Sequence, residues 1–90
     1  MDNLYTGLEY QQASQIESLS KLMYELREHR KALLAQYHVA DELAMLEQIY
    51  TGKLAEHPAY EHYLSARILW EMQETTRMTI ADHLREANKS

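Results

Sequence analysis

The chain has 90 residues, a formal charge of −5 and no cysteine. These values exclude disulfide bridges, thiolate metal sites and a cysteine nucleophile, and the acidic balance disfavours nucleic acid as a partner. The first twenty residues lack the pattern of a signal peptide, and no segment approaches the roughly 20 apolar residues of a membrane span. We therefore expect a cytoplasmic protein without a membrane partner.

The composition favours helices along the whole chain. Only two glycines and one proline occur, β-branched residues are few, and no stretch alternates apolar and polar residues as a strand does. We predict an all-α fold in a single domain, residues 1–90. It is expected to be a long helical hairpin or a three-helix arrangement, with helices at about 6–37, 41–51 and 58–87.

The first predicted helix begins at Thr6. Thr6 and Glu9 have the spacing of a capping box, in which each side chain accepts a hydrogen bond from the backbone amide of the other residue. Apolar residues then recur at steps of three and four, which places them on one helix face. This stripe consists of Ile16, Leu19, Leu22, Met23, Leu26, Leu33 and Tyr37, and Arg30 interrupts it.

A second helical segment starts after the apolar stripe changes phase between Tyr37 and Glu42. Asp41 is placed to cap a new helix, so we expect a short break at residues 38–40, although nothing there forbids a continuous helix. Gly52 should end this segment, because glycine adopts the left-handed conformation of a helix C-terminus without steric cost.

The third helix is expected to begin at Pro58, since proline suits the first turn, where its missing amide proton has no intrahelical partner. Its apolar residues predict one buried face. That face consists of Tyr60, Leu64, Ile68, Leu69, Met72, Thr76, Ile80 and Leu84.

The lengths of these segments predict a homodimer. If the first two segments form one rod and the third folds back at Gly52, Leu26 faces His83 and Leu33 faces Thr76. Residues 6–22 then extend about 25 Å beyond the third helix, with an apolar face that needs a cover. We therefore expect a dimeric helical bundle whose interface includes Ile16, Leu19 and Met23.

The aromatic residues indicate a second part of the interface. Seven tyrosines and one tryptophan occur without any phenylalanine, and tyrosine suits positions with an apolar body and a solvated tip. Tyr60, Tyr63, Arg67 and Trp70 lie on adjoining parts of the third helix, and these residue types are frequent at binding hot spots. The alternative is that Tyr63 and Trp70 simply cover a small core.

Five histidines raise the possibility of a metal site. Glu25 with His29 and His57 with Glu61 are four residues apart, so each pair shares a helix face. In the hairpin register described above, the first pair approaches Asp82 and His83 and makes a set of four possible ligands. The alternative is that both are surface pairs. A metal-binding helical bundle, drawing on these six residues and His62, is therefore a second hypothesis for function.

Catalysis is not expected, and no cofactor is implied. The serines lack the sequence context of a nucleophile, and two glycines cannot build a phosphate-binding loop. A small transcriptional regulator is a third hypothesis, because a helical turn surrounds Gly52. Glu61 would repel phosphate there, and Arg27, Arg30 and Lys31 are interspersed with acidic residues as on a solvated helix.

The first hypothesis is therefore a non-catalytic, homodimeric protein interaction module of the adaptor, regulator or chaperone-like type. Its expected partners are a second copy of the chain and another protein. It depends on the long capped helix, the apolar overhang and the tyrosine-rich surface.

Overall fold

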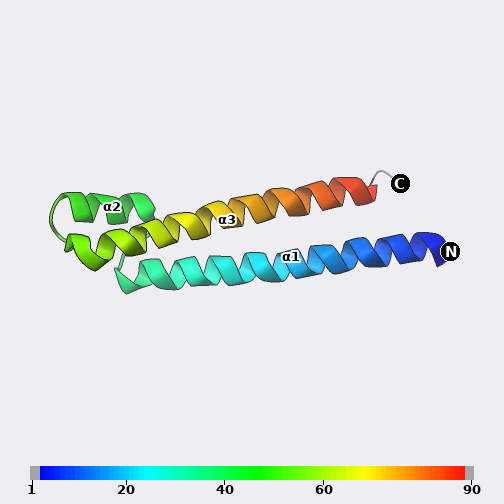
Figure 1. Ribbon diagram of the computed structural model, residues 1–90, viewed down its shortest axis with the longest axis horizontal. Helices are drawn as coiled ribbons and strands as arrows, with labels where there is room; N and C mark the ends of the chain where they lie inside the picture. The colour runs from blue at the N-terminus through cyan, green and yellow to red at the C-terminus, as the bar shows by residue number, and fades with distance from the viewer. Residues whose placement is uncertain (1–2, 89–90) are drawn as a thin grey trace.

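The computed structural model describes the backbone of residues 3–88 and the side chains of residues 10–88. These residues form three helices and no strand: α1 (Asn3–Gln36), α2 (Glu42–Tyr50) and α3 (Glu56–Asn88). α1 and α3 run antiparallel along a molecule that measures 63 × 18 × 16 Å, and the start of α1 and the end of α3 lie at the same end of this hairpin (Figure 1). The predicted all-α class with three helices is confirmed.

α1 ends in a Schellman motif. The amide of Val39 donates to the carbonyl of Leu34 over 3.2 Å, and the amide of His38 donates to that of Ala35 over 3.0 Å. His38 adopts a φ of 55°, which turns the chain out of the helix. The predicted break at residues 38–40 is therefore confirmed.

The predicted start of α1 at Thr6 is wrong, because the helix already includes Asn3. Thr6 is thus inside the helix and does not cap it. The side chains of Thr6 and Glu9 lie outside the described residues.

The ends of α2 and the start of α3 follow the expected local chemistry. The carboxylate of Asp41 accepts a hydrogen bond from the Ala44 amide over 2.8 Å and so caps α2. Gly52 follows the helix with a φ of 80°, as a left-handed terminal residue does. His57 has non-helical dihedral angles, so the regular part of α3 continues from Pro58, as predicted.

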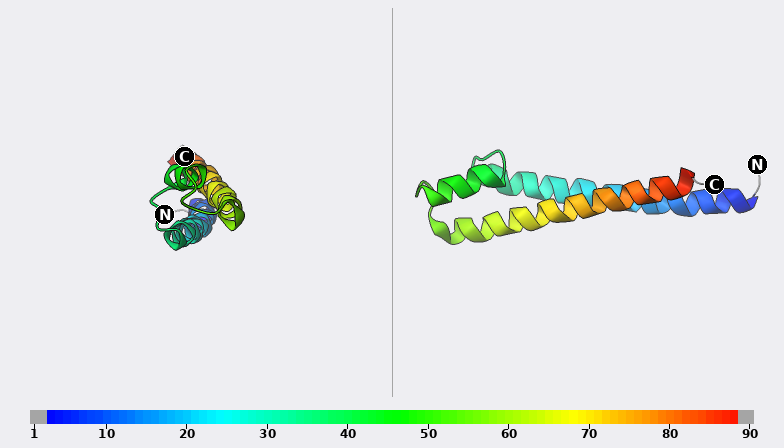
Figure 2. Two further views of the ribbon diagram at one scale, coloured as in Figure 1. Left: turned by 90° about the vertical axis from the view of Figure 1, so that its left-hand side faces the viewer. Right: turned by 90° about the horizontal axis from the view of Figure 1, so that it is seen from above.

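α2 does not extend α1 into one rod, as the hairpin register assumed. It packs against α3, and the end-on view in Figure 2 shows the three helices arranged around a triangle at this end of the molecule. The other end consists of α1 and α3 alone (Figure 1). The molecule therefore has a three-helix half and a two-helix half.

The observed register of α1 against α3 corrects the predicted pairing. Tyr37 contacts His62 near the turn, and the Nδ1 atom of His83 lies 3.2 Å from the Oε1 atom of Gln12 near the ends. Leu26 therefore does not face His83, and α3 reaches back along α1 as far as Gln12. The expected overhang of residues 6–22 is wrong, since α2 turns aside and α3 begins its return earlier.

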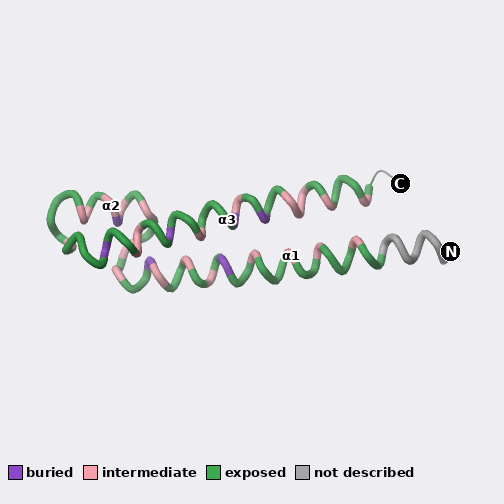
Figure 3. Tube along the Cα trace, viewed as in Figure 1, coloured by how far each residue is buried: buried purple, intermediate pink, exposed green. Residues whose placement is uncertain are grey.

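The core lies where α2 meets the hairpin. Leu34 of α1, Met45 of α2, and Ala59 and Ala66 of α3 are buried together, and Met45 is fully inaccessible. Figure 3 shows the buried positions on the sides of the helices that face one another. The two alanines explain this packing, because small residues on α3 let α2 approach closely.

The predicted buried face of α3 is largely wrong. Thr76 is buried, but five of the residues expected in the core are exposed: Tyr60, Leu64, Ile68, Met72 and Leu84. The helices that cover α3 lie against Ala59, Ala66 and Gln73 instead. These apolar side chains are therefore on the molecular surface.

Candidate functional site

α2 covers one side of the hairpin only as far as an ion pair between Arg30 and Glu42, which lies next to Trp70. The Nε and Nη2 groups of Arg30 donate hydrogen bonds to the two carboxylate oxygens of Glu42, the first residue of α2. The Arg30 guanidinium also lies 5.1 Å from the centre of the Trp70 ring. These bonds lower the pKa of Glu42, although partial burial opposes the change, and they raise the pKa of Arg30.

Beyond this ion pair, the same side of the α1–α3 pair has no covering helix within the described residues. We call this surface the α2 side. Trp70 contacts Arg30 on this side and is 44% exposed, and Leu84, which is fourteen residues later and so on the same face of α3, is 47% exposed. Ile16 and Met23 of α1 are half-buried, and their spacing places them on the stripe that leads to Arg30. The predicted interface residues Ile16, Met23 and Trp70 therefore lie on one surface.

The other predicted interface residues have different surroundings. Leu19 is half-buried and lines a hollow on the opposite side of the hairpin. Tyr63 packs against the core, and the exposed Tyr60 ring stacks on it with 5.8 Å between centroids. Arg67 is exposed and pairs with Glu71 over 3.6 Å. Tyr63 thus serves the core, as the alternative interpretation proposed.

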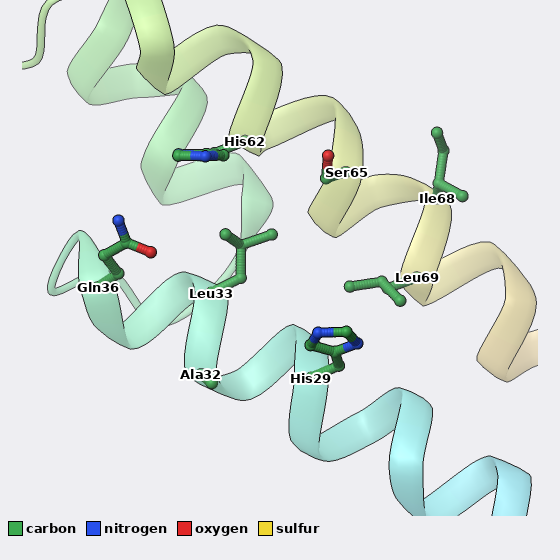
Figure 4. A pocket seen from close by; sticks show the side chains of 8 residues that line it. All are labelled: His29, Ala32, Leu33, Gln36, His62, Ser65, Ile68 and Leu69. Atoms are coloured by element: carbon green, nitrogen blue, oxygen red, sulfur yellow. The ribbon is translucent and has the colours of Figure 1, made fainter.

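A groove runs between α1 and α3 on the side opposite α2. One part of it, near the turn, has a volume of about 560 Å³. Figure 4 shows His29 and Leu33 of α1 and Leu69 of α3 pointing into the space between the helices, whereas Ile68 points away at its outer edge. The remaining lining residues of this part are Ala32, Gln36, His62 and Ser65.

Two further hollows extend this groove along the two-helix half. One continues from Ile68 along α3 past Met72 and Thr75, and the other lies between Ser18 of α1 and Thr79 of α3. The α3 residues recur at steps of three and four, so they lie on one side of the helix. We call the three hollows together the open groove.

The polar groups of the open groove do not form a catalytic pair. The Tyr37 hydroxyl bonds the Nδ1 atom of His62, and the Ser65 hydroxyl donates to the carbonyl of Glu61 over 3.1 Å. Ser65 and His62 are therefore bonded to other groups, although both line the groove. A nucleophile requires a base within hydrogen-bond reach, and the two residues do not provide one in this arrangement.

The candidate metal ligands are not brought together. His83 is near Gln12, Asp82 pairs with Arg85, and His29 lies in the open groove far along α1 from Gln12. In the side chains described, no three histidine, aspartate or glutamate groups are placed to hold a metal ion. The set of four formed from Glu25, His29, Asp82 and His83 depended on the incorrect register.

His57 and Glu61 form the predicted surface pair. The Nδ1 atom of His57 lies 2.6 Å from a carboxylate oxygen of Glu61, and both side chains are exposed. This hydrogen bond raises the pKa of His57 and lowers that of Glu61. The pair therefore links two exposed residues at the start of α3 and is not part of a metal site.

Sequence reasoning missed two features of these surfaces. Arg30 was interpreted as an interruption of the apolar stripe, whereas it joins α1 to α2. Gln73 is buried in the two-helix half, and its Oε1 atom has no hydrogen-bond partner within the described structure. The only available sign of the first feature was an arginine within an apolar stripe, with acidic residues at the start of the next helix.

Comparison with known proteins bears on the family alone. The model of the Uncharacterized protein MJ0235 family matches residues 9–90. Neither the curated proteins nor the solved structures gave a significant match. Over residues 3–88, no helix combines the length and apolar character needed to cross a membrane. Because the family model covers well over half of its length, the chain belongs to the Uncharacterized protein MJ0235 family.

Proposed function

We propose that the protein is a non-catalytic, homodimeric interaction module of the adaptor, regulator or chaperone-like type. The observation that carries this proposal is the uncovered α2 side of the two-helix half. A helix covers this side of the hairpin only as far as Arg30 and Glu42. Beyond them, the large side chains of Trp70 and Leu84 remain exposed to solvent.

The small size of the core supports association with a second chain. Among the described residues, the buried apolar positions are only Leu26, Leu34, Met45, Ala59 and Ala66. In the two-helix half, two of the buried side chains are the polar Gln73 and Thr76. A domain of this length buries a modest share of its surface, so added apolar burial between chains would stabilise it substantially.

A two-fold dimer fits this surface. In such a dimer the same patch on each chain meets its copy, so each hairpin supplies the helices that the other lacks. Trp70 lies at the α2 end of the patch, next to Arg30, and tryptophan is among the residue types most enriched at interface hot spots. The product is a helical bundle in which the two-helix halves of both chains pack together.

Light scattering coupled to size exclusion tests the dimer directly. Twice the chain mass of 10.6 kDa, about 21 kDa, is expected at micromolar concentration. Leu84→Glu places a charge on the α2 side and should give the monomer mass with helicity retained. Met78→Glu is the matched control, since Met78 is 60% exposed and lines none of the described hollows. A fully helical monomer of the unaltered chain at about 100 μM would contradict the proposal.

A further inference from the structure

We propose that the open groove binds a basic amphipathic helix of another protein. This inference goes beyond the dimer, because the groove lies on the side of the α1–α3 pair opposite the α2 side. It concerns the second expected partner and identifies it by its chemistry.

The floor of the groove is almost free of charge. Of the residues that line its three hollows, Glu71 is the only one with a formal charge. The others carry aliphatic, hydroxyl, amide or imidazole groups. Interface cores are depleted of charged residues, and the exposed Ile68 and Met72 supply the apolar contact that an amphipathic helix requires.

The borders of the groove are predominantly acidic. Glu25 is four residues from His29 and Glu61 is four residues from Ser65, so these carboxylates lie on the faces of α1 and α3 that border the groove. Asp82 and Glu86 are three residues from Thr79 and His83, so they border the far end of the groove, where Asp82 pairs with Arg85. Lys21 is the exposed cation that the spacing places on the α1 border.

Several of these acidic groups are available to a partner. Glu25 and Glu86 form no ion pair within the described structure, and the carboxylate of Glu61 bonds the imidazole of His57. Glu71 pairs with Arg67 at 3.6 Å, where both side chains are well exposed and the bond is weak. Lysine or arginine residues along both edges of an incoming helix would therefore find carboxylates on both borders.

The surface beside α2 carries more cations than the borders of the open groove. A hollow beside the α1–α2 connection is lined by Arg27, Arg30 and Lys31 together with apolar residues, although Arg30 pairs with Glu42 and Lys31 lies 4.0 Å from Glu28. A basic helix would meet cations on that side and carboxylates at the open groove. The charge distribution thus favours the open groove over the surface beside α2.

The same charges disfavour a second copy of this chain in the groove. Two grooves facing one another would bring Glu25, Glu61 and Asp82 of each chain near those of the other. Like charges placed together across an interface repel one another, so this surface suits a partner of opposite charge.

The packing of α2 shows how a helix fits beside the α1–α3 pair. α2 packs against α3 at the seam with α1, and Met45 fills the space between Leu34 and Ala66. The open groove spans α3 from His62 to His83, which corresponds to about 32 Å at 1.5 Å per residue. A partner helix of about 20 residues would fill it.

Binding of a defined peptide tests the proposal. The probe is a fluorescein-labelled helix of about 20 residues, with leucine and alanine on one face and lysine along both edges. Its control replaces each lysine with glutamate. We expect fluorescence anisotropy to show micromolar binding of the lysine peptide, at least tenfold weaker binding of the glutamate peptide, and affinity that falls as salt is added.

Two pairs of protein variants locate the binding site. Ile68→Glu and Met78→Glu both add one negative charge at similarly exposed positions, of 56% and 60%, but only Ile68 lines the groove. The first should weaken binding at least tenfold and the second less than twofold. Glu25→Lys should weaken it at least fivefold, whereas Glu47→Lys on the exposed face of α2 should leave it unchanged.

Two results would overturn the groove proposal: equal binding of the two peptides, or equal effects of Ile68→Glu and Met78→Glu. The molar mass of the same samples is measured as well, so that a loss of peptide binding can be distinguished from a loss of dimer formation. The groove is complete within one chain, so Leu84→Glu is expected to bind the lysine peptide with unchanged affinity even as a monomer.

Discussion

His38 occupies a backbone conformation that glycine adopts more easily. Its φ of 55° lies in the left-handed region, where a side chain costs about 1–2 kcal/mol. We expect His38→Gly to stabilise the chain by about 1 kcal/mol, because the gain exceeds the added freedom of the unfolded chain. For a domain of this size the thermal midpoint should rise by about 4–8 °C. His38→Ala keeps the strain, so a similar rise in that variant would contradict this explanation.

The Arg30–Glu42 pair should make stability depend on acid pH. Hydrogen bonds from Arg30 lower the pKa of Glu42, so its stabilising contribution is complete above the ordinary carboxyl pKa. That contribution is lost as the pH falls through the lowered value of the folded state. Glu42→Gln should therefore cost about 2 kcal/mol near neutral pH, and the difference from the unaltered chain should shrink in acid.

Chemical denaturation of both proteins at several pH values measures this difference. Glu47→Gln is the control, because Glu47 is exposed on α2 and makes no side-chain ion pair in the described structure. A constant difference between Glu42→Gln and the unaltered chain down to the most acid pH would show that charge is not the cause.

At the scale of the element, Met45 joins α2 to the hairpin. It is fully inaccessible and contacts the cluster of Leu34, Ala59 and Ala66. We expect Met45→Ala to destabilise the protein by about 3 kcal/mol, through lost apolar burial and the cavity left behind. Leu43→Ala on the same helix is the control, since Leu43 is 74% exposed and should change stability by less than about 0.5 kcal/mol. If urea denaturation showed equal losses of unfolding free energy for the two variants, Met45 would not be part of the core.

The ends of α2 and the start of the regular part of α3 were predictable because their causes are local. Asp41 caps α2, Gly52 ends it and Pro58 begins the regular part of α3, and each residue acts on backbone groups within a few positions. The side on which α2 packs was not predictable in this way. It depends on Met45 meeting Ala59 and Ala66, and on Arg30 meeting a carboxylate twelve residues away.

The same distinction between local causes and contacts of distant residues applies to the candidate surfaces. Trp70, Ile16 and Met23 were identified from residue type and spacing, and they do lie on one surface. The open groove was missed, because Ile68 and Met72 belong to an apolar stripe that periodicity assigns to the core. Helical spacing shows which residues share a face, but two small alanines decided which face of α3 became buried.

At the scale of the whole molecule, the two halves should differ in stability. The three-helix half contains the buried cluster around Met45, whereas the two-helix half depends on Leu26 with the polar Gln73 and Thr76. Local opening free energies follow such differences in burial. In the isolated chain the amides of residues 12–24 should therefore exchange hydrogen faster than those of residues 26–36.

Dimer formation should make the stability of the two-helix half depend on protein concentration. A tenfold increase in concentration changes the free energy available to a dimer by about 1.4 kcal/mol. For two chains of 90 residues this corresponds to a rise of about 4 °C in the thermal midpoint, and exchange in residues 12–24 should slow in parallel. Leu84→Glu should remove both dependences. Midpoints of the unaltered chain that coincide across a hundredfold range would mean that one chain is stable without its twin, and that the α2 side is solvated in the working protein.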